Sequence, residues 1–175
     1  MSTTIDLDRL GLNFGDGVRL DLELPLEDLE LGGQSYALSP NPVRARLDVS
    51  RPSRGYAFHL RFPLRVEGPC MRCLEDAVVE TEVDAREIDQ TDAEDDELRS
   101  PYVGGEEPGT PLEAGRWAHD AAILALPEQI LCRSDCAGLC AVCGESLNDA
   151  DPADHEHGGS TDPRWAKLDE LKLDQ

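Results

Sequence analysis

The sequence predicts an α+β fold: mainly an antiparallel β-meander or small barrel-like sheet, with one central helix and a short C-terminal helix. Two patterns carry this prediction. Apolar and charged residues alternate repeatedly within residues 1–88, which is typical of strands with one buried face. Apolar residues within 112–126 instead recur every three or four positions, which is typical of an amphipathic helix. A third feature, the clustering of cysteines, predicts how the two halves are held together.

Composition limits the kind of protein this is. The 175 residues carry a net charge of −21, with 39% hydrophobic and 5% aromatic residues, which suits one soluble domain of modest core. Nucleic-acid binding depends on lysine and arginine, which are outnumbered here, so no DNA binding is expected. Most of this acidic surface instead suits a basic partner. The start, MSTTIDLDRL, lacks a basic stretch followed by an apolar one. We therefore expect no signal peptide, no membrane association and a cytoplasmic location.

The sheet is expected within the first 88 residues. Residues 1–42 form a β-rich segment that packs on the core, and residues 43–88 form the meander, with strands over 43–49, 56–66 and 74–88. The sequence Gly-Pro-Cys-Met-Arg-Cys joins the last two strands. This arrangement places the first cysteine pair, Cys70 and Cys73, at a hairpin tip.

The second half of the chain divides into an acidic part and a helical part. Residues 89–111 are rich in acids, glycine and proline and are expected to form a flexible loop. Residues 112–175 contain the predicted helix, the main cysteine segment and a short helix that begins at Asp162-Pro163 and presents three apolar residues on one face, namely Trp165, Leu168 and Leu171. All four parts are expected to belong to one domain.

Six cysteines and two histidines are candidate metal ligands. Four cysteines lie within twelve residues, and thiols two or three residues apart can turn back on one ion, so the segment reads as zinc knuckles. A reducing compartment also favours ligation over disulfides. Two tetrahedral zinc sites need eight donors, and the chain offers eight: Cys70, Cys73, Cys132, Cys136, Cys140, Cys143, His155 and His157.

The pairing of these donors has more than one solution. We favour Cys70 and Cys73 with Cys132 and Cys136 in one site, because this clips the hairpin to the end of the helix across a long loop. The remaining two cysteines and the two histidines then form a second site. A rival arrangement places the four cysteines of the 132–143 segment on one zinc and leaves the first pair free. Iron–sulfur ligation is also compatible with the spacing.

Positive charge is concentrated in residues 44–72, which contain seven arginines and two acids. The rest of the chain therefore carries −26. Arginine binds phosphate through its planar guanidinium, so a contact with RNA or another partner is one interpretation. The other is that the arginines pair with glutamates of the neighbouring 74–88 strand. The candidate contact residues are Arg44, Arg46, Arg61, Arg65 and Arg72, and the last also lies beside the thiolates.

The order of motifs resembles a known family. A Cys-x-x-Cys-Leu at 70–74 precedes an acidic loop and a helix ending Leu-Ala-Leu-Pro at 124–127. Then follow Cys-x3-Cys-x-Gly-Leu-Cys-x2-Cys-Gly-x2-Leu-Asn at 132–148 and Asp-Pro-Arg-Trp-Ala-x-Leu at 162–168. This combination is similar to the YceD family of large ribosomal RNA subunit accumulation proteins. The family usually has a Cys-x-Cys where this chain has His155-Glu-His157, which keeps donors suited to zinc.

The resemblance implies a function. It implies a non-enzymatic zinc-binding factor that supports accumulation of 23S rRNA and assembly of the large ribosomal subunit. Its expected partner is the large-subunit precursor, through a basic ribosomal protein or the rRNA itself. The residues alone show no phosphate loop, no nucleophile–base grouping and no metal site with an open position, so no enzyme is expected. The alternative interpretation is a thiol-redox or zinc-responsive regulator, which requires accessible thiols at Cys70 and Cys73.

Overall fold

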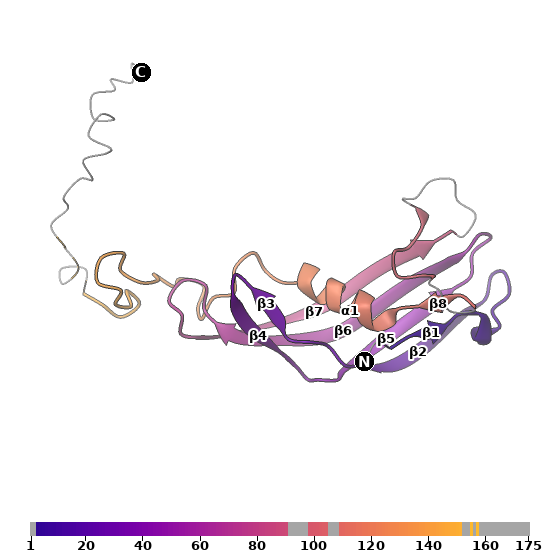
Figure 1. Ribbon diagram of the computed structural model, residues 1–175, viewed down its shortest axis with the longest axis horizontal. Helices are drawn as coiled ribbons and strands as arrows, with labels where there is room; N and C mark the ends of the chain where they lie inside the picture. The colour runs from indigo at the N-terminus through magenta and orange to yellow at the C-terminus, as the bar shows by residue number, and fades with distance from the viewer. Residues whose placement is uncertain (1–2, 91–97, 105–108, 152–154, 156, 158–175) are drawn as a thin grey trace, which may run out of the picture.

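The computed structural model describes residues 3–90, 98–104, 109–151, 155 and 157. They form a long antiparallel sheet with helix α1 (Ala114–Leu124) lying across one face, and the cysteine-rich segment lies beyond one end of the sheet (Figure 1). The fold class is therefore mainly antiparallel β with one helix in the described part of the chain. None of the described helices is long and apolar enough to cross a membrane.

The predicted meander forms the centre of the sheet. Strands β5 (Val43–Ser50), β6 (Tyr56–Pro69) and β7 (Asp76–Asp89) follow one another and pair antiparallel. Strand β2 (Gly17–Leu24) pairs with β5 over its whole length. Strands β6 and β7 stay in register for 14 residues, from Tyr56↔Asp89 to Pro69↔Asp76. Their hairpin therefore projects as one stiff arm that ends at the first cysteine pair.

Strand β6 has two successive partners on its other edge. Residues 57–61 of β6 pair with β5, whereas residues 65–67 pair with β4 (Gln34–Ser39), which in turn pairs with β3 (Leu29–Leu31). Proline at position 63 lacks a backbone N–H and lies where the ladder passes from one partner to the other. Among the described pairings none joins β2 to β7, so the sheet is open and the predicted barrel-like closure is corrected.

Alternation sends one face of each strand into the core. In β6 every even-numbered residue from Tyr56 to Val66 is buried, and the odd-numbered residues between them are half-buried or exposed. Helix α1 covers this apolar face with Trp117, Ala118 and Ala121. The N-terminal segment contributes Leu7, Leu24, Leu26 and Leu29 to the same core. The opposite face of the sheet is polar and carries the arginines.

The predicted acidic loop contains more ordered contacts than expected. Ser100 is buried and its N–H donates to the carboxylate of Asp89, while Val103 forms a bridge with Leu112. Strand β8 (Pro111–Leu112) pairs with β1 (Ile5–Asp6), next to a 3-10 turn at Asp8–Leu10. These residues of the predicted loop therefore contact the sheet, and the flexibility of the loop stays a prediction. The remainder of the loop and the predicted C-terminal helix lie outside the described residues.

Candidate metal centres

The first cysteine pair lies in a tight turn at the end of the β6–β7 hairpin. The N–H of Cys70 donates to the carbonyl of Glu75 (2.7 Å), and the N–H of Leu74 donates to the carbonyl of Cys70 (3.0 Å). The N–H of Arg72 points at the Cys70 sulfur (3.4 Å). These bonds turn both thiols to the same side, which is the arrangement of a zinc knuckle.

The turn at Cys140 repeats this geometry seventy residues later. The N–H of Cys140 donates to the carbonyl of Glu145 (2.8 Å), and that of Gly144 to the carbonyl of Cys140 (2.9 Å). The residues that flank each turn also pair, Pro69↔Asp76 in one and Leu139↔Ser146 in the other. The chain therefore contains one structural motif twice, with the pattern Cys-x-x-Cys-x-Glu.

The repeat requires a left-handed residue after its second cysteine. Gly144 adopts φ 77°, which costs glycine little. The equivalent residue in the first turn is Leu74, with φ 64°, the one non-glycine residue with positive φ in the described part of the chain. A side chain in this conformation costs about 1–2 kcal/mol, so the surrounding hairpin and contacts must hold Leu74 in place.

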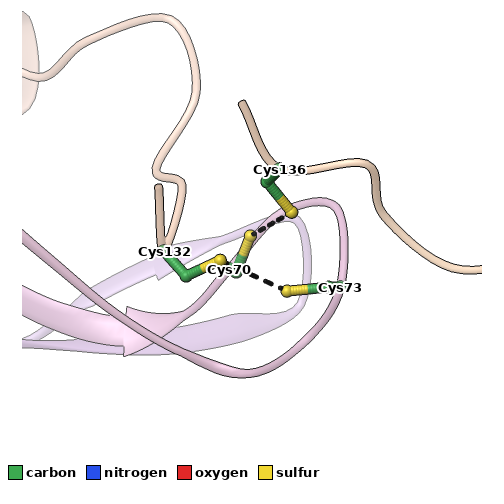
Figure 2. A group of neighbouring side chains, drawn as sticks. All are labelled: Cys70, Cys73, Cys132 and Cys136. Atoms are coloured by element: carbon green, nitrogen blue, oxygen red, sulfur yellow. Dashed lines mark hydrogen bonds between the residues drawn. The ribbon is translucent and has the colours of Figure 1, made fainter. Parts of the chain in front are cut away.

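Four cysteines converge beside the first turn (Figure 2). The Sγ atoms of Cys70 and Cys136 lie 3.8 Å apart, and those of Cys73 and Cys132 lie 3.5 Å apart. A zinc ion bound at about 2.3 Å to four sulfurs separates them by about 3.8 Å. All four sulfurs lie within 4.8 Å of one another. We call this group (Cys70, Cys73, Cys132 and Cys136) the four-cysteine site.

Contacts between the hairpin tip and the segment after α1 bring the two halves of this site together. The N–H of Met71 donates to the carbonyl of Ile130 (2.9 Å), and Ile130 is fully buried. The guanidinium of Arg72 donates to the Gln129 side chain (2.9 and 3.1 Å) and to the carbonyl of Cys136 (3.0 Å). Arg72 thus lies beside the thiolates, as expected, and its donors are used within the chain.

Tyr36 of β4 supports the tip from the other side. Its hydroxyl donates to the carbonyl of Pro69 (3.0 Å), and burial raises its pKa. Gly68 packs against its ring so closely that a Cβ there would lie 2.4 Å from the ring Cδ1. Only glycine fits this approach. Sequence reasoning missed Tyr36, Gln129 and Ile130, and the Gly68-Pro69 pair was the one signal of a close contact.

A second group forms around the second turn. Cys140, Cys143, His155 and His157 offer donor atoms within 4.8 Å of one another, and we call them the cysteine–histidine site. The Cys143 sulfur lies 3.6 Å from His155 Nδ1. Cys143 and His157 are exposed, whereas three of the four members of the four-cysteine site are buried. The two groups therefore differ in access to solvent.

Backbone hydrogen bonds favour a thiolate at the first cysteine of each turn. Burial raises the pKa of Cys70, but bonds from the backbone of Cys73, Arg72 and Cys132 outweigh it and lower the pKa to about 6. Bonds from the backbone of Cys143 and Val142 likewise lower the pKa of Cys140 to about 6. Metal ligation requires the thiolate, so both turns are suited to hold an ion.

The structure thus assembles the eight candidate donors in the two sets that we favoured from the sequence. It does not gather the four cysteines of the 132–143 segment into one group. Two bonds join the loop that carries Cys136 to the second site: Ala137 N–H donates to the Asn148 side chain (2.9 Å), and Leu147 N–H donates to the Gly138 carbonyl (2.8 Å). The 132–148 segment therefore links both groups.

The candidate arginines lie apart from the metal groups, on the polar face of the sheet, except Arg72. Arg61 donates to Asp48 (2.7 Å), and Arg65 donates to Glu80 (2.9 Å) and Glu67 (2.5 Å). Only Glu80 among these partners belongs to the 74–88 strand that we expected to supply them.

The remaining two arginines are less constrained. Arg46 lies 3.9 Å from Asp21, and Arg44 has no ion pair among the described residues although it stands opposite Glu23. Both border a groove of about 630 Å³ where β5 separates from β6. A role of these arginines in binding RNA or a protein stays a prediction.

These features define a class of protein: a sheet protein without an evident catalytic grouping among its described residues, with two four-donor groups of the kind that hold structural metal ions. Residues 58–172 match the YceD family, described as large ribosomal RNA subunit accumulation protein YceD. The match covers more than half of the chain and includes all eight candidate donors. The chain belongs to the YceD family.

Curated relatives come from mycobacteria. Uncharacterized proteins of Mycobacterium bovis and Mycobacterium tuberculosis are 35% identical over 105 residues, covering 59% of this chain and 49% of theirs. One from Mycobacterium leprae is 50% identical over 52 residues, covering 30% of this chain and 23% of its own. The chain spans about half the length of the first two relatives. No solved structure matches.

Proposed function

We propose that the protein is a non-enzymatic, zinc-stabilised factor that supports 23S rRNA accumulation and assembly of the large ribosomal subunit. The family match carries this proposal, because it extends from β6 through both donor groups. The partner would be the large-subunit precursor, contacted through a basic ribosomal protein or the rRNA. A cytoplasmic location follows from such a partner.

The donor chemistry supports zinc at both groups. Sulfur and imidazole donors in sets of four suit tetrahedral zinc, and a closed set leaves no position for a reacting water. Bound there, zinc would contribute cross-links rather than catalysis. The four-cysteine site would hold the β6–β7 hairpin against the segment after α1, and the cysteine–histidine site would close the loop from 140 to 157.

Zinc content and metal removal test the metal assignment. Mass spectrometry of the native protein should give two zinc ions per chain. Graded addition of a chelator should remove one ion early, because the cysteine–histidine site is exposed, and the second only at much higher chelator concentration. A single ion, or simultaneous loss of both, would contradict this assignment.

Ribosome profiles test the function itself. Depletion of the protein should reduce the large-subunit peak in sucrose-gradient sedimentation and the level of 23S rRNA relative to 16S rRNA. Restoring the wild-type chain should restore both, and a chain with Cys73→Ser should not. An unchanged large-subunit peak after depletion would overturn the proposal.

The thiol-redox alternative is less well supported. It requires accessible thiols at Cys70 and Cys73, whereas their residues are 0% and 4% exposed. Reactivity of Cys70 or Cys73 towards a thiol reagent in the metal-loaded native protein would revive it.

A further inference from the structure

We propose that the open edge of β7, together with the groove between β7 and α1, binds an extended basic peptide segment as an additional strand. This inference deepens the proposed function by locating the contact with a basic protein. It rests on the proposed function only for the claim that the peptide segment belongs to a basic ribosomal protein.

The edge itself is the first observation. Strand β7 runs for 14 residues in unbroken register with β6, far longer than the usual strand of about 5–6 residues. Residues 82–87 make no backbone hydrogen bond away from β6 within the described part of the chain. They contain no proline, glycine, lysine or bulge, and the protection they do have comes from charged side chains (Glu82, Asp84, Arg86 and Glu87), which disfavour an uncharged strand. This edge therefore offers a row of backbone donors and acceptors.

A groove with apolar side chains on its α1 side and charged side chains on its β7 side adjoins the edge. Helix α1 reaches β7 at its C-terminal end, where the Thr81 hydroxyl donates to the carbonyl of Ala125 (3.3 Å). The groove of about 430 Å³ is bordered by residues 82–87 of β7, by Tyr102, and by Trp117, Ala121 and Leu124 on α1. Leu124 is 85% exposed. Apolar side chains of an added strand would be buried here.

Charge selects the occupant. Glu82 and Glu87 lie on opposite faces of β7, and neither has a cation within ion-pair distance among the described residues. Glu82 stands opposite proline 63, which offers no charge, and burial raises the pKa of Glu87. An incoming lysine or arginine would pair with each acid. A chain of net charge −21 would also attract a basic segment from a distance.

The strand geometry then specifies the pattern of the peptide. Side chains of an added strand alternate between the two faces of the sheet. Those beside Val83 and Ala85 would enter the groove and be apolar, and the one beside Glu82 would be basic. Asp84 on the same face as Glu82 already contacts His59 (2.9 Å) and Arg86 (3.9 Å). One basic residue on the groove side would reach Glu87. The expected ligand is thus an extended segment with apolar residues beside Val83 and Ala85 and basic residues beside Glu82 and Glu87.

A synthetic peptide provides the probe. A fluorescent peptide of alternating lysine and valine, with one additional lysine on the valine face to reach Glu87, should bind the zinc-loaded full chain in an anisotropy titration. The same peptide with glutamate in place of each lysine should not. Glu82→Lys with Glu87→Lys should weaken binding about tenfold or more, since two charge pairs are lost. The matched control Glu27→Lys with Glu30→Lys makes the same charge change at exposed positions outside both grooves and should leave binding within about twofold.

Hydrogen exchange of the wild-type protein tests the strand itself. Binding should slow exchange at alternate amides within residues 82–87, whether or not the charge variants fold. Binding without this protection, equal weakening in the control variant, or stronger protection by an RNA oligonucleotide would overturn the inference. So would concentration-dependent protection of the same amides without peptide, which would indicate self-pairing of the edge.

The two proposals fail separately. If depletion reduces the large-subunit peak but no peptide protects β7, the function stands and this contact is wrong. If the peptide protects β7 but depletion leaves the peak unchanged, the groove stands and the ribosomal function is wrong.

Discussion

Replacing the second cysteine of each turn should affect stability very differently, although the two turns have the same backbone geometry. Cys73→Ser removes a donor from the four-cysteine site, and Cys143→Ser removes the equivalent donor from the cysteine–histidine site. The variants are matched in chemistry and in local structure. They differ in the length and content of the loop that each site closes.

The magnitudes follow from those loops. Cys73 lies 59 residues before Cys132, and a cross-link over such a loop contributes about 4 kcal/mol to the free energy of unfolding. The loop includes β7 and α1, which contribute Val83, Trp117 and Ala118 among others to the core. Cys143 lies 12 residues before His155, for which the same relation gives about 3 kcal/mol. None of the described residues of this shorter loop belongs to the core, so loss of the site should unfold the segment locally and lower core stability by less than about 1 kcal/mol.

Tryptophan fluorescence can separate these outcomes. Trp117 is 3% exposed in the core, and replacing Trp165 by phenylalanine leaves Trp117 as the sole tryptophan. Denaturant titrations of zinc-loaded protein in this background should give a much lower midpoint for Cys73→Ser than for Cys143→Ser. Equal midpoints, or a greater loss for Cys143→Ser, would refute the reasoning from loop closure.

Three further predictions follow from single residues. Gly144→Ala should cost about 1 kcal/mol in the stability of the cysteine–histidine site, because the positive φ of residue 144 disfavours a side chain although no neighbouring atom would clash with it. The measurement is the chelator concentration that removes the metal, and an unaltered concentration would contradict this. Hydrogen bonds from Arg19 and Arg61 lower the pKa of Asp48, so Asp48 should stabilise the fold above its unfolded pKa of about 4 and lose that contribution as pH falls further. Asp48→Asn should therefore reduce the loss of stability on acidification, and an unchanged loss would count against this. Arg65→Glu should cost about 1 kcal/mol in the free energy of unfolding, because it places three acids together, whereas Arg44→Glu should change it by less than about 0.5 kcal/mol. Weakened binding of Arg44→Glu to ribosomal particles would assign Arg44 to the partner contact.

Alternation in the sequence predicted which face of each strand is buried, because side chains in a strand point to opposite sides in turn. Phe58, Leu60 and Phe62 are buried as expected, and Arg61 lies on the other face. Alternation does not identify the neighbouring strand. The division of the β6 edge between β5 and β4 is a choice between distant segments. Pro63 marks where the ladder changes partner, but it does not identify either partner. Barrel closure depends on such pairings, which is why it was wrongly expected.

The donor sets were predictable for a different reason. Each zinc takes four donors, so eight suitable residues in four close pairs can be divided between two ions in only a few ways. We chose the division that cross-links the longest loop, because such a cross-link stabilises the fold most. Whether those residues hold zinc stays a prediction. The supports of the site were not predictable in this way. Gln129 binds Arg72 from 57 residues away, and leucine at position 74 gives no signal of a left-handed turn. Such contacts depend on the assembled fold.

The repeated turn also explains how one motif can have two roles. In the first copy a stiff 14-residue hairpin and Tyr36 hold the turn, so a strained Leu74 is tolerated and the site is buried in the core. The second copy follows a single bridge at Leu139↔Ser146, and it uses Gly144, which needs no such support. Hydrogen bonds through Asn148 and Gly138 join the loop that carries Cys136 to the second copy, so the two sites are coupled. The coupling should show mainly at the second site, which has less support from the fold. Loss of the four-cysteine site should therefore weaken metal binding at the cysteine–histidine site, whereas loss of the cysteine–histidine site should leave the four-cysteine site loaded.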